Sequence, residues 1–172
     1  MPLPIAHGLL GASVVAAVLP APVSVRYAKP LLFGAVLANT PDFDFALVFL
    51  LNSDKWHRGF THSIMFAVLI AMMFIAYRGR RKFREALAYG LAFASHFVLD
   101  FVTTKEGGGL ELFFPFSDGR FGLRWFGLSE MPSKVSVFEI LQNLTIEFAL
   151  FASLLIFILG LRKMMLRLIV KK

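Results

Sequence analysis

The sequence predicts an all-α protein, a polytopic bundle of membrane helices with about five apolar segments, the second one broken at Pro41. Three observations predict this class. Hydrophobic residues make up 58% of the 172 residues and charged residues 17%, whereas soluble domains are about half apolar and about a quarter charged. The apolar residues form long runs, and the basic residues lie between the runs. We therefore expect a single integral membrane domain over residues 1–172, with an outer loop at 103–136.

The five apolar segments differ in length. They cover residues 5–19, 30–51, 62–77, 83–102 and 137–161. Because a helix rises about 1.5 Å per residue, about 20 residues cross a hydrocarbon core of about 30 Å. The first and third segments are shorter than that, so we expect their ends to lie in protein or in the membrane interface. The first segment lacks a preceding Lys or Arg and runs into Pro20 and Pro22, so we expect it to be retained rather than cleaved as a signal peptide.

The second segment contains an NTPDFD motif at residues 39–44. Thr40 is suited to a helix N-cap, Pro41 to the first helical position and Asp42 to the first turn. The motif therefore predicts a helix that stops and restarts inside the membrane. An interrupted backbone at that depth is tolerated where it is buried in protein or lines a wet cavity.

The basic residues indicate an orientation. Most of the 18 Lys and Arg residues fall in three places, at Arg26 and Lys29, at 78–84 and at 162–172. If all five segments cross the membrane, these places share one side, which the positive-inside rule makes cytoplasmic. The opposite side, which includes the outer loop at 103–136, then faces the periplasm of a Gram-negative cell. Alternatively, the basic clusters flank short hydrophobic hairpins. Because the positive charge lies between apolar segments, the net charge of +7 does not indicate a nucleic-acid partner, and we expect none.

Ionisable side chains gather in the outer halves of the apolar segments. Such groups are costly inside a membrane and usually functional. In the orientation given above, those that share this level are His7, Asp42, Asp44, His57, His62, His96, Asp100 and Glu147. Their convergence predicts a site just beneath the outer face.

The spacing of these residues is typical of metal ligation. His96 and Asp100 lie one turn apart on one helix face, and Asp42 and Asp44 offer two oxygen donors at a helix start. Imidazole and carboxylate without thiolate predict a divalent metal, one or two ions, with zinc first and manganese or iron as alternatives. The predicted ligands are His7, Asp42, His57, His62, His96 and Asp100.

Three further residues are candidates for catalysis. Asp44 and Glu147 are candidates for general acid or base. Arg58 is a candidate for binding an anionic group of the substrate. For Arg58 the alternative is an interfacial arginine that snorkels to the headgroups, and for Glu147 a hydrogen-bonding anchor between helices.

Five motifs carry a resemblance to a known family. They are AHGLLGA (6–12), NTPDFD (39–44), HRGFTHS (57–63), SHFVLDFVTT (95–104) and FFPFSDGRF (113–121). In order and spacing they resemble the bacterial membrane-bound metal-dependent hydrolases, inner-membrane proteins of which one branch is described as LexA-regulated. More distantly, the pattern is similar to zinc-dependent phospholipase C, whose helical enzymes also use a late His-x-x-x-Glu pair. Here that pair reads Asn143-x-x-x-Glu147, which favours one or two metals over three.

The resemblance and the residues together imply a function. We expect a metal-dependent hydrolase at the outer face of the inner membrane, acting on a lipid or lipid-linked phosphoester that diffuses in sideways. One alternative is an ion or metal transporter, although the inner halves of the segments lack acids and histidines apart from Glu85. The other is a non-catalytic structural or regulatory membrane protein whose metal ties helices together. The oligomeric state stays open.

Overall fold

The computed structural model describes residues 2–19, 27–103, 108–123 and 136–170. Within these ranges the regular elements are all helical, apart from one isolated antiparallel bridge between Leu110 and Phe121, which confirms the all-α class. The α-helices are α1 Pro4–Val18, α2 Ala28–Leu37, α3 Phe45–Leu51, α4 Ile64–Arg78, α5 Phe83–Thr103 and α6 Val137–Val170. Short 3₁₀ turns connect some of them: η2 Pro41–Asp44, η3 Asp54–Trp56, η4 Phe60–His62 and η5 Arg80–Lys82. Two parts of the expected outer loop, 104–107 and 124–135, lie outside the described residues.

Several helices are long and apolar enough to cross a membrane. By length and composition these are Ala28–Leu51, Arg80–Thr103 and Val137–Leu168. A fourth span results if η3, η4 and α4, which meet at a bend of 51°, are counted together. All five expected segments are thus helical, and α1, with 15 residues, is apolar but short. It spans about 22 Å at the usual rise per residue.

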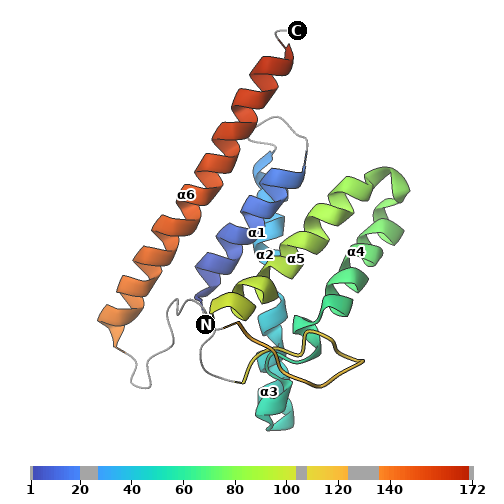
Figure 1. The fold of residues 1–172 in the computed structure, drawn as a ribbon, viewed down its shortest axis with the longest axis vertical. Coiled ribbons are helices and arrows are strands. Elements are labelled where there is room, and N and C mark those ends of the chain that lie inside the picture. The colour runs from blue at the N-terminus through green and yellow to red at the C-terminus, as the bar shows by residue number, and fades with distance from the viewer. Residues whose placement is uncertain (1, 20–26, 104–107, 124–135, 171–172) are drawn as a thin grey trace.

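The short helix α1 lies at the centre of the bundle. It packs against α2, α5 and α6, and Figure 1 shows α6 on one side of it and the α4–α5 hairpin on the other. Small residues allow the close approach to α2: a Cβ added to Gly11 would lie 2.4 Å from the Cβ of Ala38 and 2.6 Å from the carbonyl oxygen of Gly34. Small residues at such crossings let helix backbones pack closely in membranes.

The close contact of α1 and α2 leads to a stability prediction. Gly11→Ala should lower the stability of the purified protein by about 1–3 kcal/mol, because the added methyl group overpacks the crossing. Gly160→Ala is the matched control, since a Cβ there meets no atom within 4 Å. Thermal unfolding in one detergent, followed by circular dichroism, compares the two. Equal midpoints for the two variants would show that the crossing tolerates the methyl group.

The second span is interrupted at Pro41, as the motif predicts. α2 ends at Leu37, the backbone turns through η2, and α3 resumes at Phe45. Thr40 occupies the expected N-cap position, but its hydroxyl donates to the carbonyl oxygen of Leu37 at 2.7 Å and makes no cap bond. At the interruption the last carbonyl groups of α2 accept donors from the turn and from side chains, and Asp44 is buried in the bundle while Asp42 is 16% exposed.

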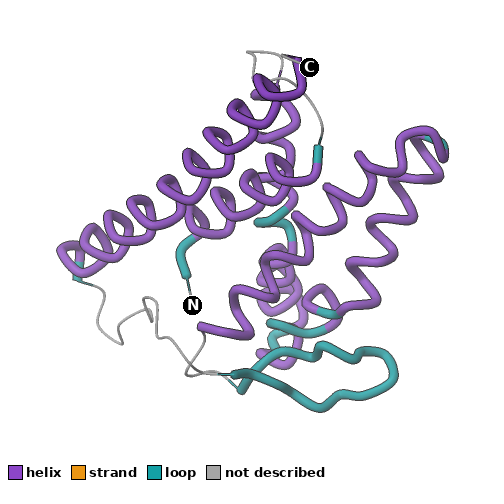
Figure 2. Tube along the Cα trace, turned by 45° about the horizontal axis from the view of Figure 1, so that its top comes forward, coloured by secondary structure: helices purple, strands orange, loops and turns teal. Residues whose placement is uncertain are grey.

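A hairpin covers the start of α4. Leu110 and Phe121 exchange two backbone hydrogen bonds of 2.9 Å, and the amide of Ile64 donates to the carbonyl oxygen of Leu112 at 3.0 Å. Figure 2 shows this loop, residues 108–123, lying across the ends of α4 and α5. The helix α4 is capped by Ser63, whose Oγ accepts the amide of Phe66 at 3.1 Å.

The two ends of the bundle differ in character. The start of α1, the helix α3 and the hairpin lie at one end (Figure 1). The α4–α5 turn and the C-terminal end of α6 lie at the other, and these segments carry the runs Arg78–Lys82 and 162–167. The arrangement therefore separates the basic runs from the end at which the histidine motifs lie.

Candidate metal centre

Four side chains that are far apart in the sequence meet inside the bundle. Asp42 comes from η2, His62 from η4, and His96 and Asp100 from consecutive turns of α5. Each offers one ligand atom, and these atoms all lie within 4.8 Å of one another. The side chains of His62, His96 and Asp100 are fully buried and that of Asp42 is 16% exposed. We call these residues the four-donor cluster, and all four belong to the ligand set that the sequence predicts.

The donor atoms point toward a common centre. The Nε2 atoms of His62 and His96 lie 3.1 Å apart. Oδ1 of Asp42 lies 3.3 Å from Nε2 of His96 and 3.7 Å from Nε2 of His62. Oδ2 of Asp100 lies 3.8 Å and 4.0 Å from the same two nitrogens. Two imidazoles and two carboxylates are a donor set that zinc and neighbouring divalent metals accept.

His96 is held by the broken helix. Its Nδ1 lies 2.7 Å from the carbonyl oxygen of Ala38, at the position where α2 has just ended. The last carbonyls of a helix have no partner within the helix and so are available to side-chain donors. Because a carbonyl oxygen carries no hydrogen, Nδ1 of His96 must donate, and its Nε2 is left with a lone pair that faces the centre.

His62 is held by Asp44 and Thr61. Its Nδ1 lies 3.3 Å from Oδ2 of Asp44 and 3.0 Å from the hydroxyl of Thr61. Asp44 also accepts the Thr61 hydroxyl at 3.1 Å and the backbone amide of Arg58 at 2.8 Å. A carboxylate that receives Nδ1–H of a histidine orients the ring and raises the basicity of Nε2, as around many metal-bound histidines. The observed contacts thus favour Asp44 as a positioning residue.

These contacts leave a lone pair on each of the two facing nitrogens. Two lone pairs at 3.1 Å repel each other unless a positive charge lies between them. A divalent ion bound by both rings would supply that charge. A shared proton would also do so.

The carboxylates of the cluster distinguish these two cases. Both oxygens of Asp100 and Oδ1 of Asp42 are buried and have no hydrogen-bond partner among the described residues. Each buried oxygen that lacks a hydrogen bond typically destabilises the folded state by about 1–3 kcal/mol, so the three oxygens together are unfavourable by several kcal/mol. One proton between the rings leaves these oxygens unsatisfied, whereas a divalent ion reaches all four donors. The residues present therefore fit a metal ion.

His7 lies beside the cluster. Its ring stacks on that of His96, with centroids 3.9 Å apart and planes inclined by 22°. Its Nε2 is 3.5 Å from Oδ1 of Asp100, and both ring nitrogens lack a hydrogen-bond partner among the described residues. His7 is not one of the four donors that share a centre. It is placed to contact the second oxygen of Asp100, and its expected role as a ligand stays a prediction.

A second group of donors adjoins the first. Asp42, Asp44 and His57 also offer ligand atoms within 4.8 Å of one another. Nδ1 of His57 lies 3.1 Å from Oδ1 of Asp44, and the His57 side chain is 21% exposed. Since Asp44 already faces donors from His57, Arg58, Thr61 and His62, a second ion would have to displace some of them. The geometry favours one ion, with His57 at the mouth of the site.

Arg58 reaches the cluster from a strained backbone position. Its φ of 58° lies in the left-handed region, which is uncommon for a residue other than glycine. Its amide donates to Asp44, and its carbonyl oxygen accepts the amide of Glu111 from the hairpin at 3.1 Å. The buried guanidinium places Nε 3.7 Å from Oδ2 of Asp100. Strained positions held in this way often occur at functional sites.

Glu147 makes a different kind of contact. It projects from α6, is almost fully buried, and accepts the backbone amide of Leu3 with both oxygens, at 3.2 Å and 2.9 Å. Leu3 precedes α1, and His7 follows in the first turn of that helix. The contact therefore ties α6 to the segment that presents His7. A catalytic role for Glu147 stays a prediction.

Two partners of the cluster are absent from the predicted site residues. Thr61 is adjacent to His62 in the HRGFTHS motif, and its hydroxyl donates to Asp44, whereas Ser63 caps α4. Its position next to a candidate ligand is a signal that could have identified it. The carbonyl of Ala38 has no such signal, because any residue supplies a carbonyl oxygen.

Comparisons with known proteins identify the family of the chain. Over 111 residues the chain is 35% identical to the inner membrane protein YbcI of Escherichia coli (strain K12), covering 60% of this chain and 63% of that relative. No solved structure matches the chain significantly. The profile described as YdjM inner membrane protein matches residues 1–169, nearly the whole chain. With its apolar helices, the chain is therefore a multi-pass inner-membrane protein, and it belongs to the YdjM inner membrane protein family.

Proposed function

We propose that this protein is a metal-dependent hydrolase that cleaves a lipid or lipid-linked phosphoester at the outer, periplasmic face of the inner membrane. The observation that carries the proposal is the four-donor cluster, with two facing Nε2 atoms and buried carboxylate oxygens that have no hydrogen-bond donor within the described part of the chain. When bound, a divalent ion in such a donor set acidifies a coordinated water and so supplies a nucleophile near neutral pH.

The residues around the cluster have distinct roles in this proposal. Arg58 neutralises a phosphoryl oxygen of the substrate, since its guanidinium lies next to Asp100. His57 stands at the partly exposed mouth and exchanges protons with the substrate or with water. In the reaction, the oxygen of water bonds to phosphorus, the P–O ester bond breaks, and a proton goes to the departing alcohol.

The surroundings of the site support a substrate that is embedded in the membrane. The same end of the bundle exposes apolar side chains on α3, where Phe49 is 82% and Leu50 is 78% exposed. The hairpin that covers Arg58 exposes Phe116 at 87%. Such surfaces are suited to the acyl region and interface of a bilayer. The outer-face assignment depends on the position of the basic runs at the opposite end of the bundle.

An assay of the purified protein tests this function. With added zinc or manganese, the protein should hydrolyse at least one member of a panel of phospholipids and lipid pyrophosphates, and a chelator should abolish the activity. Arg58→Gln should lower kcat/KM by about tenfold, because one charge-assisted hydrogen bond to the substrate is lost. Arg120→Gln is the matched control, since that partly exposed arginine pairs with Glu111 in the hairpin. Absence of any metal-dependent turnover would refute the hydrolase assignment.

The burial of the donors favours one second candidate, a metal that only ties the helices together. Structural sites are closed, whereas catalytic sites keep a position open to water or substrate. His62, His96 and Asp100 are fully buried, and only Asp42 has limited access to solvent. In that case chelation should unfold the protein, whereas for the hydrolase the chelated protein should keep its helical circular dichroism and regain activity when metal is restored.

A further inference from the structure

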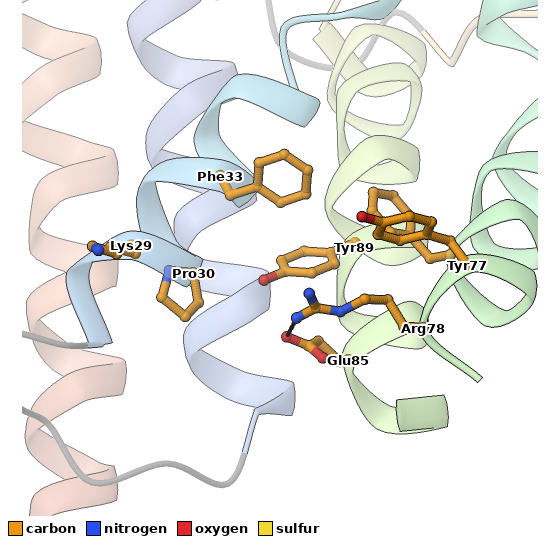
Figure 3. Close-up of a pocket in the computed structure, with 8 residues that line it drawn as sticks. Lys29, Pro30, Phe33, Tyr77, Arg78, Glu85 and Tyr89 are labelled. Atoms are coloured by element: carbon orange, nitrogen blue, oxygen red, sulfur yellow. Dashed lines mark hydrogen bonds and ion pairs between the residues drawn. The ribbon is translucent and has the colours of Figure 1, made fainter. Parts of the chain in front are cut away.

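A pocket between three helices lies far from the four-donor cluster. It has a volume of about 440 Å³ and is lined by residues of α2, α4 and α5 (Figure 3). Glu85, at its mouth, and His96 are both on α5, about three turns apart along the helix. The pocket arises because α2 and α4 each pack against α5, which lies between them. Its lining residues Arg78 and Glu85 flank the α4–α5 turn, which lies at the opposite end of the bundle from α3 (Figure 1).

The floor of the pocket is aromatic, with one ring from each helix. The ring of Tyr89 from α5 has its centroid 4.8 Å from that of Phe33 on α2 and 5.2 Å from that of Phe74 on α4. The rings of Phe33 and Phe74 are 5.7 Å apart and nearly perpendicular. Edge-to-face contacts of this kind are favourable and hold the rings in place. The floor is thus a fixed apolar surface.

The mouth of the pocket is basic. Lys29 is on one wall, at the start of α2, and Arg78 is on the other, at the end of α4. Glu85 pairs with Arg78 at 2.9 Å and with Lys82 at 3.7 Å, so two cations share one carboxylate, and Lys29 adds a third positive charge to the lining of the pocket. Figure 3 shows the Arg78–Glu85 pair directed toward the ring of Tyr89. The Arg78 side chain is 47% exposed and can therefore reach a second anion.

On each of the three helices, the charged residue at the mouth and the aromatic residue of the floor are four positions apart. Phe33 follows Lys29 by four positions, Arg78 follows Phe74 by four, and Tyr89 follows Glu85 by four. Residues four apart lie on one face of a helix, one turn above each other. The pocket therefore has a charged ring at its mouth and an aromatic ring about 6 Å deeper. An amphipathic ligand with an anionic head and an apolar body matches both layers.

We propose that this pocket binds an anionic phospholipid, with its phosphate between Lys29 and Arg78 and its acyl chains against the aromatic floor. Basic pockets between membrane helices bind anionic lipid headgroups. The neighbouring surface continues the apolar path, since Leu32 is 68% and Met73 is 56% exposed. A soluble anion would use the mouth and leave the floor without a partner. The family membership places the chain in a membrane in which such lipids surround it.

Native mass spectrometry of the full chain in detergent tests this proposal. Phosphatidylglycerol should bind more tightly than phosphatidylcholine with the same acyl chains. Lys29→Gln and Arg78→Gln should each weaken phosphatidylglycerol binding about fivefold, because one basic residue near an anionic headgroup contributes about a factor of five. The control is Arg80→Gln with Arg81→Gln, which removes two exposed charges of the same turn that do not line the pocket.

A substitution that should strengthen lipid binding distinguishes a specific effect on the pocket from misfolding. Glu85→Gln removes the carboxylate that competes for Arg78, so it should strengthen phosphatidylglycerol binding, about fivefold by the same reasoning. A misfolded variant would not gain affinity. Equal binding of the two lipids, or equal weakening by the pocket and control variants, would overturn the proposal. Displacement of the lipid by millimolar inorganic phosphate would do so as well and would identify a site for soluble anions.

Discussion

Replacing His96 with alanine should reduce the metal content of the purified protein from about one equivalent to less than about a tenth of one. Structural zinc sites are stabilised by about 10–16 kcal/mol, so one ligand of four contributes about 3–4 kcal/mol, or a factor of several hundred in affinity. The loss at this position is compounded because the His96 ring also supports the stacked ring of His7. Hydrolysis, where it depends on the metal, should disappear with it.

Elemental analysis of the wild type beside the variant makes this measurement. Asp100→Ala should behave like His96→Ala, because both of its buried oxygens lie in the cluster and lack other hydrogen-bond partners among the described residues. His57→Ala is the control: it should leave the metal content unchanged, since this side chain belongs only to the second group of donors. A fall from two equivalents to one in His57→Ala would show two ions. Equal metal content in the wild type and His96→Ala would show that the four-donor cluster is not a metal centre.

The parts of the site that the sequence predicts are those carried by local geometry. His96 and Asp100 are four positions apart, and a helix over 83–102 necessarily stacks them on one face. The break at Pro41 follows from the missing amide of proline and the turn-forming residues beside it. In both cases the property is encoded within a few residues, so it does not depend on which helices become neighbours.

The parts that the sequence does not predict depend on the neighbours. Glu147 shares a helical face with Asn143, which indicates a polar contact but not its partner, and the partner is the amide of Leu3, which is 144 positions away. The left-handed backbone at Arg58 depends on two hydrogen bonds, one of them to the hairpin amide of Glu111. The sequence pattern does not predict such hydrogen bonds, because any backbone amide or carbonyl group can serve as the partner.

The choice of helix cap shows the same limit at short range. Thr61 and Ser63 are both good cap residues, and the motif HRGFTHS offers either one. In the structure Ser63 caps α4, which leaves the hydroxyl of Thr61 between Asp44 and His62. A shift of two residues in the helix start thus decides whether a hydroxyl supports a helix or a ligand. Periodicity does not resolve helix boundaries at that level.

Asp44→Asn should weaken metal binding about 10–100-fold while leaving the stoichiometry at about one ion, because Asp44 acts on the metal through His62. The amide has the shape of the carboxylate but carries no charge, so it accepts Nδ1–H of His62 less strongly and lowers the basicity of the opposite nitrogen. It can also present its NH₂ group to His62, which would favour the wrong tautomer. Both effects reduce affinity without removing a donor from the four-donor cluster.

Competition with a chromogenic chelator separates this positioning role from direct ligation. The apparent Kd of Asp44→Asn should rise at saturating metal with an unchanged end point, whereas His96→Ala should reach no end point under the same conditions. Thr61→Val, which removes the hydroxyl between Asp44 and His62, should shift the Kd in the same direction by a smaller factor. Complete loss of the ion in Asp44→Asn would make Asp44 a ligand, and an unchanged Kd would show that the orientation of His62 does not depend on it. Because Asp44 also accepts the Arg58 amide, circular dichroism of each variant must match the wild type for the comparison to hold.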